Sequence, residues 1–283
     1  MTELPKSKNK AKIWSVESGK IRPRSDYLAT EEPLEIRLFA NGERRTVAVT
    51  MRTPGNDFEL AAGFLYSEGI INKREDIRRI THCVDREIDL ENRYNIVNVE
   101  LAIEELPNLI TLERHFYTTS ACGVCGKTSL DALRLRGFSA IQTGQKVTTE
   151  ILSQLPDKLR PSQGIFAATG GLHAAALFNM EGELLAVRED VGRHNALDKL
   201  IGWALLGNYL PLHNYIVLVS GRSSFEILQK CLAAGVPIIC AVSAPSSLAV
   251  ALAEEFGITL VGFLRGEKFN VYAGVERISI NSI

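Results

Sequence analysis

Apolar and polar positions alternate along the first half of the chain in the way that is typical of half-buried strands. This alternation predicts four strands, over residues 34–38, 46–50, 77–84 and 94–99. Asn41-Gly42 lies between the first two and favours a hairpin turn. Residues 58–69 carry apolar side chains at helical spacing and predict a helix. This half therefore predicts a small α+β unit.

The second half alternates continuous apolar runs with amphipathic segments. The apolar runs predict strands over residues 173–178, 183–187, 215–219, 237–242, 258–264 and, less regularly, 270–272. The amphipathic segments predict helices over residues 149–159, 195–206, 223–234 and 246–256. Such alternation predicts an α/β unit with parallel strands covered on both faces. The strands that end at Val219, Val242 and Leu264 are expected to be parallel neighbours.

These patterns divide the chain into four parts. We expect a disordered basic tail over residues 1–30, because they are polar and carry Lys6, Lys8, Lys10 and Lys12. Residues 31–115 form the predicted N-terminal α+β subdomain, and 116–145 a mobile loop with two cysteines and a short helix. Residues 146–283 form the predicted larger α/β domain.

Composition is that of an ordinary globular protein: 283 residues, 46% of them hydrophobic and 23% charged, with a net charge of −1. This charge gives no case for binding nucleic acid or an anionic membrane. No signal-like start and no apolar run of about 18 residues occurs, so no membrane partner is expected. Five cysteines, an odd number, argue against a disulfide framework and for a reducing cytoplasm. Of these, Cys83, Cys231 and Cys240 are expected to be buried.

Cys122 and Cys125 stand apart from those three cysteines. Gly123 and Gly126 allow positive φ, which favours a loop that exposes the sulfur atoms. Lys127 and the start of a helix close behind it would place positive potential near the thiols and favour the thiolate. The pair therefore predicts thiol chemistry.

Zinc is the usual alternative for a C-x-x-C pair, and this sequence does not favour it. A structural zinc site needs two further Cys or His ligands, yet the chain has no second C-x-x-C and no H-x₃₋₅-H. A zinc deaminase needs H-x-E and P-C-x-x-C, but no histidine precedes a glutamate by two positions and Ala121 precedes Cys122. We expect no zinc. The order of elements also does not resemble a thioredoxin fold.

Polar loops follow three of the predicted parallel strands and suggest a phosphate site. Arg222 and Ser223 lie after the first strand, Ser243 after the second and Arg265 after the third. The carboxyl edge of an open α/β sheet is where ligands bind, and helix N-termini there favour anions. We expect these four residues to converge on a diphosphate. The alternative is plain N-capping of the helix by Ser223 or Ser224.

Two further polar segments are compatible with either a functional site or a purely structural role. Residues 188–195 combine Asp, Arg, His and Asn before a helix, which favours a site containing His194. In the alternative, Asp190 or Asn195 caps the helix and the charges pair. His173 follows a polar turn and is equally compatible with a satisfied histidine at a strand start.

Taken together, six segments resemble the FdhD/NarQ family of formate dehydrogenase accessory sulfurtransferases. They are RTPG at 52–55, TSACGVCG at 119–126, TGGLH at 169–173, EDVGRHNA at 189–196, SGRSS at 220–224 and FLRG at 263–266. The resemblance covers nearly the whole chain beyond the tail.

The resemblance implies a cytidine-deaminase-like α/β fold, a mixed or parallel sheet with helices on both faces that lacks the zinc site. It implies a sulfur carrier that takes persulfide sulfur from a cysteine desulfurase. The acceptor is the molybdenum (or tungsten) bis-pterin guanine dinucleotide cofactor of formate dehydrogenase, and GDP is expected to mimic it. Cys122 would carry the persulfide with Cys125 assisting. The implied cofactor contacts are Phe263, Leu264, Arg265, Gly266, Glu267 and Lys268.

A second function class stays open, a chaperone that binds the cofactor without sulfur chemistry. We also expect a homodimer in the cytoplasm.

Overall fold

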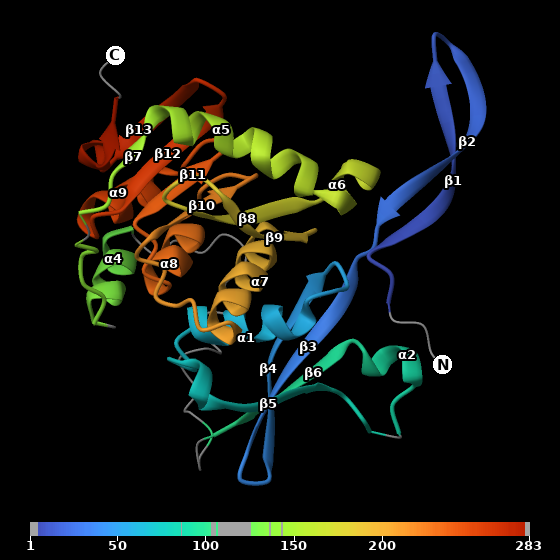
Figure 1. Ribbon diagram of the computed structural model, residues 1–283. Coiled ribbons are helices and arrows are strands. Elements are labelled where there is room, and N and C mark those ends of the chain that lie inside the picture. The colour runs from blue at the N-terminus through green and yellow to red at the C-terminus, as the bar shows by residue number, and fades with distance from the viewer. Residues whose placement is uncertain are drawn as a thin grey trace.

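The fold is described from a computed structural model, which describes residues 5–85, 87–102, 106, 126–135, 137–142 and 144–280. Two sheets form the body of the molecule, and a two-stranded ribbon projects from it (Figure 1). The larger, mixed sheet with its helices and the smaller sheet confirm the predicted α/β class. The more specific resemblance to cytidine deaminases stays a prediction.

The smaller sheet has four strands in the order β4-β3-β6-β5. They are β3 (Glu32–Ala40), β4 (Glu43–Arg52), β5 (Ile77–His82) and β6 (Ile96–Leu101). Asn41 and Gly42 have φ of 46° and 84°, which confirms the predicted hairpin turn between β3 and β4. Helix α1 (Asp57–Ser67) packs its apolar face on one side of this sheet, around Leu34, Ile36 and Leu60. The short elements η1 (Arg74–Asp76) and α2 (Leu90–Arg93) flank β5.

The larger sheet has six strands in the order β13-β12-β11-β10-β8-β9. They are β8 (His173–Asn179), β9 (Leu184–Asp190), β10 (Tyr215–Val219), β11 (Ile238–Ala241), β12 (Thr259–Arg265) and β13 (Lys268–Ala273). As predicted, β10, β11 and β12 are parallel neighbours. The other three strands run antiparallel to their neighbours, because hairpins join β8 to β9 and β12 to β13.

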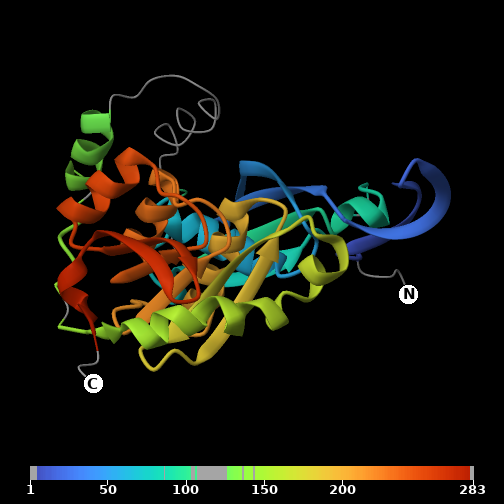
Figure 2. The ribbon, with the colours of Figure 1, turned by 90° about the horizontal axis from the view of Figure 1, so that it is seen from above.

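Helices cover both faces of the larger sheet, also as predicted (Figure 2). One face packs on α5 (Thr149–Leu159), which buries Leu152, Leu155 and Leu159. The opposite face packs on four helices: α4 (Gly126–Leu135), α7 (Arg193–Leu206), α8 (Phe225–Ala233) and α9 (Ser247–Glu255). The sheet is therefore the middle layer of a three-layer unit.

Short elements complete this unit. They are η2 (Arg160–Ser162) and α6 (Gly164–Thr169) after α5, η3 (Val275–Arg277) after β13, and a two-stranded parallel bridge between β7 (Val147–Thr148) and β14 (Ile278–Ser279). The sequence pattern missed β7, β14 and α6, because elements of two to six residues are too short to show a period.

The two sheets are joined through α1 and α7, which cross between them (Figure 1). Gly63 and Gly202 make the close crossing possible. A Cβ atom on Gly63 would come within 1.8 Å of the Asp198 carbonyl oxygen, and one on Gly202 within 1.8 Å of the Glu59 carbonyl oxygen. Since no side chain fits in that space, the backbones of the two helices touch.

The predicted disorder of residues 1–30 is wrong for the part that the structure describes. Strands β1 (Lys8–Glu17) and β2 (Lys20–Ala29) pair in antiparallel register and form the projecting ribbon. The error came from reading lysine-rich alternation as a solvated tail. In the ribbon, Lys8, Lys10 and Lys12 share one face with Trp14, so the lysines are every second residue of a strand.

Within the described residues, no helix is long and apolar enough to cross a membrane.

Candidate functional site

The parallel strands β10, β11 and β12 bring three polar loops to one edge, and hydrogen bonds join these loops. Ser223 N donates to Ala244 O at 3.2 Å, and Ser246 N donates to Ser223 O at 2.9 Å. Phe263 N donates to Ser243 O at 3.1 Å. The segments that contain Ser223, Ser243 and Phe263 therefore lie side by side, as the sequence predicted for these strand ends.

Helices α8 and α9 begin at this edge and differ in how their first turns are capped. In α9, the Ser246 hydroxyl accepts a hydrogen bond from Ala249 N at 3.2 Å, an ordinary N-cap. In α8, Ser224 stands at the N-cap position but its side chain makes no cap hydrogen bond. Ser223 is fully buried, and its Oγ has no hydrogen-bond partner among the described residues. Capping therefore does not explain the serines before α8.

Residues 263–268 form the hairpin between β12 and β13. Phe263 has φ of 53° and is 40% exposed, and Gly266 follows with φ of 56°. Arg265, Glu267 and Lys268 are exposed as well, so five of the six predicted cofactor contacts can meet a ligand, with Gly266 half-buried. Leu264 is fully buried in the core against α5, so its side chain cannot make such a contact.

A polar cluster lies next to this edge, where α7 and α8 begin. His194 Nε2 lies 3.4 Å from Ser224 Oγ and 3.9 Å from a Glu226 carboxylate oxygen. Burial, and then the neighbouring Arg193 guanidinium, lower the pKa of His194 to about 4. The same two causes lower the pKa of His173. Both imidazoles are therefore neutral at pH 7.

Sequence reasoning selected His194 from this cluster but missed Arg193, Glu226 and the part played by His173. A Cβ atom on Gly221 would come within 3.3 Å of His173 Nδ1 and 3.7 Å of Arg193 Cβ, so these three residues pack together. The Gly-Arg-His-Asn segment that ends at Asn195 could have indicated that Arg193 belongs to the same cluster as His194. This segment does not show that α7 starts beside α8, because only the order of the strands in the sheet places the two helices there.

Other polar residues of the 188–195 segment are structural. Asp190 forms a buried ion pair with Lys199, with 2.7 Å between Oδ2 and Nζ. The same carboxylate accepts hydrogen bonds from Thr53 N at 3.1 Å, Gly192 N at 2.8 Å and Asn195 Nδ2 at 3.2 Å. Asp190 therefore ties the start of α7 to the smaller sheet, which supports the alternative of paired charges for this half of the segment.

The RTPG segment has a similar structural role. Arg52 is fully buried and donates from Nε and a terminal nitrogen to the two Asp57 carboxylate oxygens at 3.0 and 3.1 Å. It also donates to Asn95 Oδ1 at 3.0 Å. These bonds fix the turn between β4 and α1, since a buried guanidinium needs its charge and its N–H groups satisfied.

Cys122 and Cys125 lie outside the described residues. Helix α4 begins at Gly126, so it already includes Lys127, behind which the sequence suggested the helix start. The other three cysteines are buried as predicted, and burial raises the pKa of Cys231 and Cys240. Those two thiols are therefore unreactive.

Among the residues that the structure describes, no three His, Cys, Asp or Glu side chains are grouped so that they could hold a metal ion.

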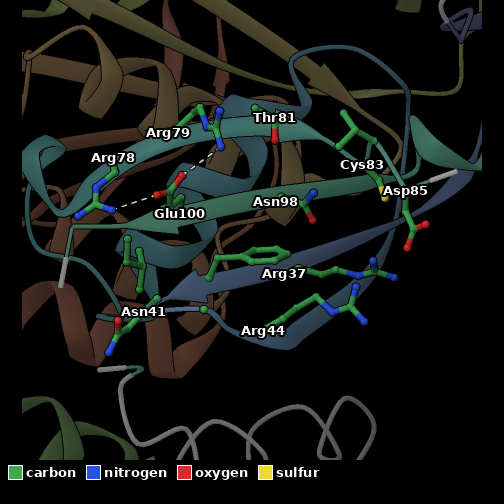
Figure 3. Close-up of a pocket in the computed structure, with 15 residues that line it drawn as sticks. Arg37, Asn41, Arg44, Arg78, Arg79, Thr81, Cys83, Asp85, Asn98 and Glu100 are labelled. Atoms are coloured by element: carbon green, nitrogen blue, oxygen red, sulfur yellow. Dashed lines mark hydrogen bonds and ion pairs between the residues drawn. The ribbon is translucent and has the colours of Figure 1, made fainter. Parts of the chain in front are cut away.

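A separate cavity of about 550 Å³ opens on the smaller sheet, on the face away from α1 (Figure 3). Its lining carries four guanidinium groups, from Arg37, Arg44, Arg78 and Arg79. Ion pairs occupy three of them: Glu35 binds Arg37 at 2.7 Å, and Glu100 binds Arg78 at 3.1 Å and Arg79 at 3.3 Å. Asp85 adds a further negative charge to the lining. The charges nearly balance, so this lining has little excess positive charge with which to hold an anion.

Comparisons with known proteins agree on one family. The model of the FdhD/NarQ family matches residues 29–279. Among curated proteins, "Sulfur carrier protein FdhD" of Streptomyces coelicolor is 55% identical over 273 residues, which is 96% of this chain and 95% of the relative. The protein of the same name from Sulfolobus acidocaldarius is 44% identical over 272 residues, 96% of this chain and 98% of the relative.

A solved structure agrees with these sequence matches. It is a crystal structure of a candidate formate dehydrogenase accessory protein from Desulfotalea psychrophila. Its TM-score is 0.74 at 28% identity, and the match covers 96% of this chain and 99% of that chain.

Proposed function

The chain belongs to the FdhD/NarQ family, and from this membership we propose that it is a sulfur carrier that serves formate dehydrogenase. Relatives that bear the name sulfur carrier protein are 44–55% identical to this chain, and the match covers almost their whole length. The Cys122–Cys125 pair lies within the segment that carries the resemblance. These observations support sulfurtransferase chemistry at that pair.

The chemistry proposed for Cys122 is thiol exchange with a persulfide. The Cys122 thiolate attacks the terminal sulfur of a persulfide on a cysteine desulfurase. The new S–S bond leaves Cys122 as a persulfide, and the donor cysteine departs as a thiolate, so no outside oxidant is needed. Cys125 assists or resolves this persulfide. Lys127 follows the pair directly in the sequence, and a positive charge or a helix N-terminus near a thiol favours its thiolate form.

The proposed sulfur acceptor is a molybdenum or tungsten cofactor that carries guanine dinucleotides. The residues at the edge of β10–β12 fit such a ligand, because buried Ser223 Oγ lacks a partner and α8 starts without a side-chain cap. Arg222, in the loop after β10, and Arg265, at the end of β12, are exposed, and each guanidinium can bind two phosphate oxygens. Phe263 offers an exposed ring at the same edge, suited to stacking on a base.

A chaperone that binds the cofactor without sulfur chemistry is the second candidate. It would use the same edge and leave the thiols idle. Substitution of Cys122 by alanine separates the two candidates. Wild-type protein is incubated with a cysteine desulfurase and cysteine and is then weighed by mass spectrometry. We expect the wild type to gain roughly 32 Da, the mass of one sulfur atom, for each persulfide formed by exchange. We expect Cys122→Ala to gain no sulfur at position 122.

Complementation completes the experiment. In cells that lack the endogenous carrier, Cys122→Ala is expected to abolish formate dehydrogenase activity, and the buried Cys231→Ala is the matched control that retains activity. If Cys122→Ala still supports an active dehydrogenase, the chaperone function is correct and the sulfur carrier is not.

Two further properties belong to this proposal. Purified protein is expected to contain no stoichiometric zinc, and elemental analysis that finds one zinc per chain would reopen the zinc interpretations. The protein is also proposed to be a cytoplasmic homodimer, with the β1–β2 ribbon as a contact between the two copies.

A further inference from the structure

The cavity of about 550 Å³ lies on the face of the smaller sheet that points away from α1 (Figure 3). The apolar side chains of β3 and β6 point toward α1, so the residues between them point into the cavity. These are Arg37 and Phe39 on β3 and Asn98 and Glu100 on β6, and the register pairs Arg37 with Asn98 and Phe39 with Glu100. Sites for small organic ligands have volumes of roughly 300–1,000 Å³, so this cavity is large enough for one.

At one end of the cavity, two guanidinium groups share a single carboxylate. Glu100 lies 3.1 Å from Arg78 and 3.3 Å from Arg79, and Figure 3 shows the three side chains together. Since one negative charge faces two positive charges, this end keeps an excess of one positive charge. Both guanidinium groups are exposed, so they can also bind a carboxylate that enters from solvent.

The opposite end holds a cation and an anion that the described fold leaves available (Figure 3). Arg37 is already held by Glu35 through two hydrogen bonds of 2.7 Å. Arg44 makes no hydrogen bond or ion pair with a described residue. The Asp85 carboxylate accepts one hydrogen bond within the described chain, from Glu87 N at 3.0 Å. Arg44 and Asp85 together therefore suit a zwitterion, whose carboxylate and ammonium are close to each other.

Between the two ends, Asn98 leaves an acceptor unsatisfied (Figure 3). Its Oδ1 is inaccessible to solvent and has no hydrogen-bond partner among the described residues. An ordinary solvated sheet face would let water satisfy such an atom, because polar side chains there are hydrated. An N–H group of a ligand would supply the missing donor. Phe39 adds apolar surface beside it, so the middle of the cavity suits a short aliphatic chain with an amide N–H.

We propose that this cavity binds an amino-acid derivative with an α-ammonium and an α-carboxylate at one end, an amide N–H in the middle and a second carboxylate at the other end. A γ-glutamyl peptide is the simplest molecule of this class. Its α-carboxylate binds Arg44 and its α-ammonium binds Asp85. Its amide N–H binds Asn98 Oδ1, and its second carboxylate binds Arg78 and Arg79. The site lies on a different sheet from the β10–β12 edge and does not depend on the proposed function.

Calorimetric titration of the full chain with γ-L-glutamylglycine tests this site. We expect a Kd between about 10 μM and 1 mM, because a ligand of this size gains limited free energy per atom. Arg44→Gln and Asp85→Asn should each weaken binding about tenfold or more, since each loses one charge-assisted contact. Arg45→Gln is the matched control and should bind as the wild type does, because Arg45 is exposed on the same strand but does not line the cavity.

Two analogues of the probe test its two ends. N-Glutarylglycine lacks only the ammonium and should bind the wild type about tenfold more weakly. Asp85→Asn should weaken binding of this analogue no further, because the partner of Asp85 is already missing. L-Glutamine keeps the zwitterionic end and lacks the second carboxylate. It should also bind more weakly than the probe, and Arg79→Gln should not weaken it further.

Protection of Cys83 from alkylation reports on the location of the bound probe. Cys83 lines the cavity and is 6% exposed, so its reaction with iodoacetamide can be followed by peptide mass spectrometry. Bound γ-L-glutamylglycine should slow this reaction in the wild type and in Arg222→Ala, and at the same concentration should not slow it in Arg44→Gln.

Three results would overturn the proposal. The first is the absence of binding at about 10 mM probe, which exceeds the expected Kd by a factor of ten or more. The second is equal affinity of the wild type, Arg44→Gln and Asp85→Asn. The third is binding that Arg222→Ala abolishes and Arg44→Gln leaves intact, because the probe would then lie at the edge of the larger sheet. Affinity for GDP, measured in parallel, should be unchanged in Arg44→Gln.

Discussion

At the scale of single residues, the protonation of His194 makes the stability of the protein depend on pH. Burial, and then Arg193, lower the pKa of His194 to about 4, from about 6.5 in an unfolded chain. The unfolded state therefore binds more protons than the native state between these two pH values. The contribution of neutral His194 to stability is fully present above about pH 6.5 and is lost as the pH falls toward 4.

We expect the Cε1 proton of His194 to titrate in NMR spectra with a midpoint close to 4, with His194→Gln used to assign the resonance. The same variant should flatten the decline of stability between about pH 6.5 and 4, measured by urea unfolding. A midpoint near 6.5 would contradict the half-buried position of the ring beside Arg193.

The exposed arginines of the edge provide a prediction about affinity. Arg222→Ala and Arg265→Ala should each weaken GDP binding by roughly ten- to a hundredfold, because a charge-assisted hydrogen bond contributes about 1.5–3 kcal/mol. Persulfide loading of Cys122 should be largely unaffected. Calorimetry measures the first effect and mass spectrometry the second. If both variants bind GDP as tightly as the wild type, the nucleotide does not lie at this edge.

At the scale of elements, the contact between α1 and α7 depends on Gly202. A methyl group there would come within 1.8 Å of the Glu59 carbonyl oxygen, and no rotamer change can relieve a clash with backbone. Gly202→Ala should therefore destabilise the protein by about 3 kcal/mol or more, although alanine favours helix. Gly164→Ala is the matched control, since nothing lies within 4 Å of the added atom. Thermal unfolding measures both variants. If Gly202→Ala and Gly164→Ala unfold at the same temperature, the helices α1 and α7 are not in contact at Gly202.

The β1–β2 ribbon predicts how two copies associate. It exposes Trp14 at 71%, Val16 at 67% and Ile21 at 66%, and an isolated two-stranded ribbon is marginally stable in water. Residues 8–29 carry six Lys or Arg and two Asp or Glu, whereas the whole chain has a net charge of −1. The rest of the chain is therefore acidic, and this opposite charge would favour contact with the ribbon of a second copy in the proposed dimer.

Substitution of Trp14 by glutamate should thus shift the protein from dimer to monomer, as measured by light scattering after gel filtration. Lys12→Gln, on the same ribbon face, is a milder control that weakens the dimer only at low salt. A wild type that is monomeric at all concentrations tested, or a Trp14→Glu variant that stays dimeric, would contradict this role of the ribbon.

At the scale of the whole molecule, the Asp190–Lys199 pair joins the two sheets. Lys199 Nζ also donates to Thr53 O at 2.8 Å, so the network holds the segment after β4 against the start of α7. Asp190→Asn leaves Lys199 as an uncompensated buried charge, and we expect a loss of about 3–5 kcal/mol in the free energy of unfolding. Glu100→Gln breaks only exposed ion pairs and should cost less than about 1 kcal/mol.

Denaturant unfolding followed by tryptophan fluorescence and by circular dichroism measures this loss. Because the pair lies between the sheets, Asp190→Asn should move both transitions together. Two separate transitions in the wild type would mean that the two units fold independently and that the network does not couple them.

The sequence by itself determined most of the longer elements and indicated which residues are candidates for chemistry. Apart from the two-residue β7, the strands from β3 to β13 could be placed from the sequence, because each is long enough to show either alternation or a continuous apolar run. Asn41-Gly42 specified its hairpin through local backbone preference alone. The Cys122–Cys125 pair and the loops after β10–β12 were also visible in the sequence, since the neighbours that mark them are adjacent in the chain.

Only the tertiary structure decided what the polar residues do. Asp190, Arg193 and His194 lie within one motif, yet Asp190 is buried against Lys199 while Arg193 has no partner among the described residues. The difference arises from long-range contacts: Thr53 lies 137 residues from Asp190, and Ser224 lies 30 residues from His194. The lysine-rich start was misread for a related reason, because pairing of β1 with β2 depends on cross-strand contacts that alternation alone cannot distinguish from a solvated tail.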